Sequence, residues 1–171
     1  MYNRPLTNEY VPLAEKYIQL VPEGNVVEIL KNQHAQLLLL LQNLTEEQAN
    51  YQYALGKWSL KTVVGHIADV ERLWQYRVFR IARGDVRGLS GYDRDVFAQN
   101  NPAEHVSLTE VLRDYSAVRQ ATISLLEHLS DEALERLGEF SDHPLSARAA
   151  AFIIAGHEAH HVNILQERYL V

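Results

Sequence analysis

The sequence predicts an all-α protein, folded as a four-helix bundle with a long connection between its second and third long helices. Three observations support this prediction. Apolar residues recur at intervals of three and four in four long segments, which is the period of an amphipathic helix. Each segment is bounded by a residue that commonly caps or terminates a helix. No segment shows a convincing strand pattern, in which apolar and polar residues alternate between turn signals.

The first two long helices are expected at about 25–44 and 59–83. The first carries apolar residues spaced for one face: Val26, Leu30, Leu37, Leu41 and Leu44. Residues 45–48 then have the pattern of a capping box that opens a short turn. Ser59 is a good N-cap for the second helix, and Gly84 is a natural terminator. Both boundaries therefore follow from local chemistry.

The third and fourth long helices also begin at serine caps. Ser107 precedes the third helix, Glu110 completes its capping box, and the helix is expected to end near Leu129. Ser146 caps the fourth helix, which should run almost to Tyr169. Four helices of this length favour an antiparallel-type bundle.

Three segments lie outside these helices. Residues 1–23 contain three prolines and are expected to form an irregular N-terminal arm, with one short helix at about 13–20. Residues 84–106 exceed the ~12–15 residues usual between elements, so they either act as a lid or contain a short helix at about 93–100. Residues 130–145 form a shorter connection.

Composition excludes several classes of protein. The chain has 171 residues, 47% of them hydrophobic, which suits one domain over residues 1–171. Its longest apolar run, Ala149–Ala155, is far shorter than the ~20 residues of a membrane span, and the N-terminus lacks a secretory pattern. A net charge of −6 without a basic run makes nucleic acid an unsuitable partner. With no cysteine, the chain has no thiol of its own. We expect a cytoplasmic protein.

The histidines indicate a metal site. His157 and His161 are four residues apart on the apolar stripe of the fourth helix, so both should point into the bundle and could share one ion. His66 lies on an inward stripe of the second helix and is the best third ligand, while Gly65 beside it suggests close approach by another segment. A lone histidine in either place would more often be a core residue. His34 is the runner-up ligand. The other histidines are expected to be solvated or structural: His105, His128, His143 and His160.

The same residues spell the zinc-protease pattern His157-Glu158-x-x-His161. The extended form of that pattern would need Gly and His where this chain has Ile164 and Glu167, and few residues follow His161 to supply a third ligand. The third ligand must then come from upstream, on another helix. This argues against a protease.

A wider resemblance covers the chain from about Tyr10 to Leu170. The Lys57-Trp58-Ser59 helix start, the segment 65–72 and the closing segment 156–170 resemble the DinB/YfiT-like superfamily. The resemblance implies a four-helix bundle with one divalent metal held by three histidines, here His66, His157 and His161. The metal would be zinc or nickel, or else iron or manganese. Characterised relatives are metal-dependent transferases or isomerases that use low-molecular-weight thiols such as bacillithiol or mycothiol, and several are homodimers.

Three functions follow for such a site. Three neutral imidazoles leave an ion its full charge and an open position, as in catalytic zinc. The first hypothesis, from the resemblance, is transfer of a low-molecular-weight thiol to a small electrophile. The second is metal-dependent hydrolysis of a small substrate. The third is a stress-associated bundle in which the metal only stabilises the fold. A small-molecule substrate and a possible homodimer are the expected partners, with no nucleic acid and no membrane.

Two carboxylates are candidates for the general base of a hydrolase. Asp69 is three residues after His66 and faces nearly the same way, although a salt bridge to Arg72 is as good an interpretation. Glu158 points about 100° away from His157, so it is a better partner for a ligand than a base. Arg77 and Arg168 could meet an anionic substrate, but ion pairs with glutamates of the bundle are the expected use.

Overall fold

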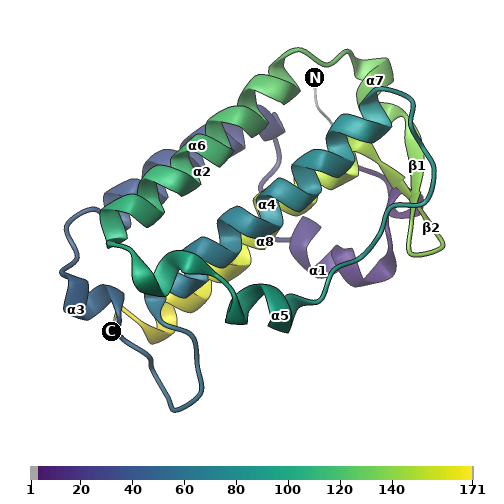
Figure 1. Cartoon of the computed structure of the whole chain (residues 1–171). Helices are drawn as coiled ribbons and strands as arrows, with labels where there is room; N and C mark the ends of the chain where they lie inside the picture. Colours follow the sequence, from purple (N-terminus) through teal and green to yellow (C-terminus); the bar gives the residue numbers. More distant parts are fainter. Residues whose placement is uncertain (1–3, 171) are drawn as a thin grey trace.

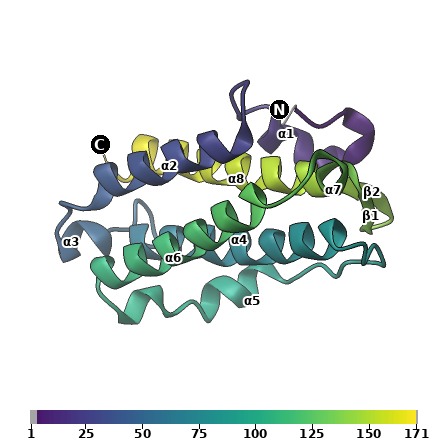
Figure 2. The same ribbon diagram turned by 90° about the horizontal axis from the view of Figure 1, so that it is seen from above.

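The structure is a computed structural model that describes residues 4–170, and four long helices form its body (Figure 1). They are α2 (Val26–Leu41), α4 (Leu60–Ala82), α6 (Leu108–Glu127) and α8 (Ala147–Arg168). Seen from above, α2 and α8 form one layer, and α4 and α6 form the other (Figure 2). Each layer contacts the other through the pairs α4–α8 and α2–α6, so α2 lies diagonally opposite α4. The predicted mostly helical four-helix bundle is confirmed.

The three predicted serine caps are present, and Asn25 caps α2 in the same way. Side chains of Asn25, Ser59, Ser107 and Ser146 each accept a hydrogen bond from a backbone N–H in the first turn. The capping box between Ser107 and Glu110 is complete. Helix α2 ends at Leu41, three residues before the expected end, because the chain must turn there so that Thr45 can cap α3 (Glu46–Ala49).

The connections contain the expected short helices. Helix α5 (Arg94–Gln99) and a 3-10 turn at Pro102–His105 lie in the long link after α4. In the N-terminal arm, two 3-10 turns (Thr7–Glu9 and Pro12–Ala14) precede α1 (Glu15–Ile18), which packs on α8. A Cβ atom added to Gly156 of α8 would lie 2.0 Å from the backbone oxygen of Tyr17. Only glycine fits at this contact.

A β-hairpin corrects the expectation that the chain has no strand. After α7 (Asp131–Glu135), strands β1 (Leu137–Phe140) and β2 (His143–Ser146) pair antiparallel. The turn uses Ser141 and Asp142 at φ 52° and 62°, a left-handed backbone that glycine or asparagine signals more clearly. Glycine and proline within the strands further obscure the pattern. Leu89 forms a bridge with Phe140, which ties the long link to the hairpin.

A buried ion network lies between two apolar clusters in the interior. Arg119 of α6 is fully buried and binds all three other long helices. Its Nε donates to Glu71 of α4 at 2.9 Å, its Nη2 also reaches Glu158 of α8, and its Nη1 donates to the Leu30 carbonyl of α2 at 3.0 Å. The Tyr115 hydroxyl donates to the same Glu158 oxygen at 2.9 Å. No helix within residues 4–170 is long and apolar enough to cross a bilayer.

Candidate metal centre

Helices α4 and α8 bring His66, His157 and His161 together. Possible ligand atoms of the three rings all lie within 4.8 Å of one another. The Nε2 atoms of His157 and His161 are 3.1 Å apart, and the His66 ring centre lies 5.1 and 4.9 Å from those of His157 and His161. The apolar stripes of the two helices therefore place these side chains as their periodicity predicts.

Aromatic rings enclose the cluster. Trp58, just before the cap of α4, has its ring centre 4.9 Å from that of His66. The ring centre of Tyr17 of α1 lies 5.6 Å from those of both His157 and His160. The N-terminal arm and the start of α4 thus limit the access of water to the three imidazoles.

Burial keeps the three imidazoles neutral. Desolvation lowers the pKa of His66 to about 4 and that of His161 to about 3, and it lowers the pKa of His157 well below its usual value. The nearby positive charge of Arg94 lowers the pKa of His66 and His161 further. Neutral imidazole is the form that binds a metal.

The residues present fit a divalent ion. Two nitrogens bound at 2.0–2.1 Å in a tetrahedral shell are separated by about 3.3 Å, close to the 3.1 Å between His157 and His161. Within the described chain, no carboxylate forms an ion pair with any of the three rings. Three imidazoles without a carboxylate could hold one divalent ion and would leave coordination positions open.

Asp69 lies one turn from His66 and is held by the long link. It accepts hydrogen bonds from Asn101 at 2.8 Å and from Arg72 at 3.4 Å, and Arg72 binds Asp114 more closely. Burial raises the pKa of Asp69. Asn101 approaches α4 at Gly65, where a Cβ atom would lie 2.5 Å from the Asn101 Oδ1. The close approach predicted at this glycine is confirmed.

Glu158 is directed away from the histidines. Only 1% exposed, it binds Arg119 and Tyr115 through Oε2. Burial raises its pKa, and the charge of Arg119 opposes that effect. Among the described residues, no hydrogen bond joins Glu158 to His157 or the other rings. Its suggested roles as a base or as an orienting partner remain predictions.

Arg77 contradicts the expectation of an ion pair. The buried guanidinium lies over the rings of Trp74 and Phe140 at 4.4 and 4.3 Å and donates to the Ser90 carbonyl. Burial lowers its pKa to about 10. Neither Arg77 nor the exposed Arg168 pairs with a carboxylate in the part of the chain that the structure describes.

The sequence did not reveal the aromatic rings around the three histidines or the buried ion network of Arg119. The burial of Arg119 could have been predicted, because Arg119 lies four residues from both Tyr115 and Ile123 and so shares their apolar stripe. Trp58 and Tyr17 carried no such signal, because their contacts with the site depend on tertiary packing. The runner-up ligand His34 lies outside the cluster and contacts the Ser116 hydroxyl at 3.0 Å.

A cavity of about 300 Å³ opens beside His161. Its wall includes the aromatic rings of Trp58 and Tyr169 and three charged residues, Lys57, Arg94 and Asp95, of which Arg94 and Asp95 form an ion pair at 3.4 Å. A small molecule could reach His161 from this side.

Family membership follows from sequence comparison. Residues 29–165 match the sequence profile of the DinB superfamily. The chain belongs to this superfamily. The match covers most of this DinB protein, including all three histidines, and confirms the resemblance stated above. No curated protein sequence matches this DinB protein.

Two solved structures from Bacillus subtilis share the fold of this DinB protein. YfiT, described as a probable metal-dependent hydrolase with an unusual four-helix bundle topology, has a TM-score of 0.72 at 19% identity, over 95% of this chain and 89% of its own. The DinB-like protein YjoA has a TM-score of 0.61 at 17% identity, over 84% of this chain and 88% of its own. At these identities the likeness concerns the fold.

Proposed function

We propose that this DinB protein is a divalent-metal-dependent hydrolase of small substrates, with His66, His157 and His161 as the metal ligands. The observation that carries the proposal is the buried cluster of three neutral imidazoles beside an open cavity. A divalent ion held there supplies a Lewis acid that can lower the pKa of water from ~15.7 to about 7. The description of YfiT as a probable metal-dependent hydrolase agrees with this choice.

Other residues of the chain have separate tasks in this scheme. Trp58 and Tyr17 exclude bulk water from the imidazoles. Lys57 lines the cavity, forms no ion pair with a described residue, and attracts an anionic group of the substrate. We assign proton acceptance to Asp69 rather than to Glu158, because the Asp69 side chain is 27% exposed and Glu158 is engaged by Arg119.

A second candidate is transfer of a low-molecular-weight thiol to a small electrophile. In that reaction the thiol loses its proton, a carbon–sulfur bond forms, and the leaving group departs with the electron pair. The chain has no cysteine, so the thiol would come from a cofactor. Lys57 beside His161 favours this candidate, because a thiol cofactor with a carboxylate would find a charge partner there.

The metal site is tested by elemental analysis of the wild type, His66→Ala and, as the matched control, His34→Ala. We expect about one equivalent of zinc or nickel in the wild type and the control, and loss of metal from His66→Ala because two imidazoles bind more weakly than three. Normal metal content in His66→Ala would contradict the three-histidine site.

The reaction is tested on the metal-loaded protein with a panel of esters and with bacterial thiols plus a generic electrophile. Hydrolysis that is lost on chelation and reduced about 10²-fold or more in Asp69→Asn supports the hydrolase with Asp69 as base. Full activity in both Asp69→Asn and Glu158→Gln would refute the base assignment. A sharp fall in melting temperature on chelation, with no turnover of any substrate, would favour a metal that only stabilises the bundle.

A further inference from the structure

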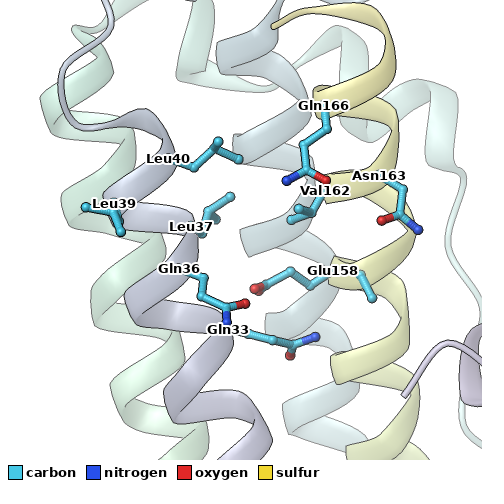
Figure 3. A pocket seen from close by; sticks show the side chains of 10 residues that line it. Gln33, Gln36, Leu37, Leu39, Leu40, Glu158, Val162, Asn163 and Gln166 are labelled. Carbon is cyan, nitrogen blue, oxygen red and sulfur yellow. The ribbon is translucent and has the colours of Figure 1, made fainter. Parts of the chain in front are cut away.

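A second cavity, of about 590 Å³, lies between α2 and α8 (Figure 3). Its lining comes from both helices and includes Gln33, Gln36 and Leu40 of α2 and Glu158, Val162 and Gln166 of α8. None of the three metal-site histidines lines it. The cavity is therefore separate from the one beside His161.

Two buried oxygen atoms at this cavity lack hydrogen-bond partners. They are Oε1 of Glu158 and Oε1 of Gln33, and neither has a partner among the described residues. The other ends of both groups are fixed, because Glu158 Oε2 binds Arg119 and Tyr115, and Gln33 Nε2 donates to the Ala155 carbonyl at 2.9 Å. Figure 3 shows both side chains reaching from α2 and α8 into the space between the helices. Buried oxygens without donors are costly, so a ligand that brings N–H groups would stabilise them.

The charge around the cavity favours a cation. No lysine, arginine or histidine lines it, and the ion network behind it has two carboxylates, Glu71 and Glu158, for one guanidinium. The walls formed by Leu37, Leu40 and Val162 are apolar, which suits a short hydrocarbon chain.

We propose that this cavity is a second ligand site, which binds a small organic cation of the alkylamine or alkylguanidine class. Its N–H groups donate to Oε1 of Glu158 and Oε1 of Gln33, and its hydrocarbon chain lies against Leu37, Leu40 and Val162. The site does not depend on the proposed reaction, because no residue that binds the metal lines it.

The test is titration calorimetry on the zinc-loaded full chain with n-butylguanidinium as the probe. Butylurea has the same shape without the charge, and pentanoate has the opposite charge. We expect saturable binding of one butylguanidinium per chain, about tenfold tighter than that of butylurea, and no binding of pentanoate. Leu40→Trp fills the apolar wall, and Gln33→Met removes an acceptor at constant length, so each should weaken binding about tenfold or more.

Asn32→Trp is the matched control, because Asn32 is exposed on α2 and does not line the cavity. It should bind the probe like the wild type. Zinc content is measured in every variant. Failure of the proposed metal site would appear as lost zinc, whereas failure of this proposal would appear as lost butylguanidinium binding. The proposal is overturned if butylguanidinium gives no saturable heat, if it binds no better than butylurea, or if Leu40→Trp binds it normally. It is also overturned if the protein is a dimer that Leu40→Trp dissociates, since a second copy would then fill the cavity.

Discussion

Replacing Arg119 with methionine tests how strongly the buried ion network stabilises the bundle. Arg119, Glu71 and Glu158 have side chains that are 0%, 2% and 1% exposed. Methionine fills most of the arginine volume but removes the Arg119 hydrogen bonds to Glu71 and the Leu30 carbonyl, and it leaves Glu158 with the Tyr115 hydroxyl alone. Breaking a buried ion pair by removing one partner costs about 3–5 kcal/mol. We therefore expect Arg119→Met to lower the free energy of unfolding by about 4 kcal/mol at pH 7.

The pH dependence of this loss has a definite sign. Burial raises the pKa of Glu158, and the charge of Arg119 opposes that effect, so removal of Arg119 should raise the folded-state pKa of Glu158 further. A group with a raised folded pKa contributes stability at low pH that is lost as the pH rises through that pKa. The difference between the variant and the wild type should thus be largest at pH 7 and shrink towards pH 5.

Urea denaturation of the zinc-loaded proteins, followed by circular dichroism, measures both effects. Arg113→Met is the matched control, because Arg113 is exposed on the same helix and its replacement should change the unfolding free energy by less than about 0.5 kcal/mol. A loss below about 1 kcal/mol in Arg119→Met, or a loss that does not change with pH, would refute this account of the network.

Three further predictions concern the metal centre and its enclosure. In the metal-free protein, His66 and His161 have lowered pKa values when folded, so below about pH 6.5 the unfolded chain binds protons that the folded chain does not. The unfolding free energy, measured by urea titration, should therefore fall by about 2 kcal/mol per histidine between pH 7.5 and pH 5. The fall should be smaller in His66→Gln. Gly156→Ala should displace α1, since the new Cβ meets the Tyr17 backbone oxygen, and limited proteolysis should then cut the N-terminal arm faster; an unchanged rate would contradict the contact. Nickel should quench the fluorescence of Trp58, whose ring lies 4.9 Å from that of His66, and quenching that persists in Trp58→Phe would exclude this proximity.

The long helices were predictable because their signals are local. Ser59, Ser107 and Ser146 cap the helices that they precede in the sequence, and each cap requires only the next turn of backbone. The hairpin was not predictable in this way. Its turn places Ser141 and Asp142 in a left-handed backbone, and Leu89, distant in sequence, supports its edge. Such a strand is specified by its neighbours more than by its own residues.

The histidine cluster was predictable for a similar reason. His157 and His161 share one helix face, and His66 lies on an inward stripe of another helix, so periodicity predicts that all three rings point into the bundle. The orientation of Glu158 could not be derived from α8 alone, because Arg119 of another helix determines where its carboxylate lies. Prediction of a partner on a different helix requires the packing of the whole bundle.

The ion network also determines how the helices are aligned along the bundle axis. Apolar residues can exchange one partner for another, so an apolar interface alone would resist a sliding helix only weakly. A slide of α8 by one turn, about 5.4 Å, would carry Glu158 out of reach of Arg119 and leave buried charges without partners. The same slide would move His157 and His161 out of level with His66. Arg119 thus fixes the axial alignment of the helices, which keeps histidines from two separate helices at the same height.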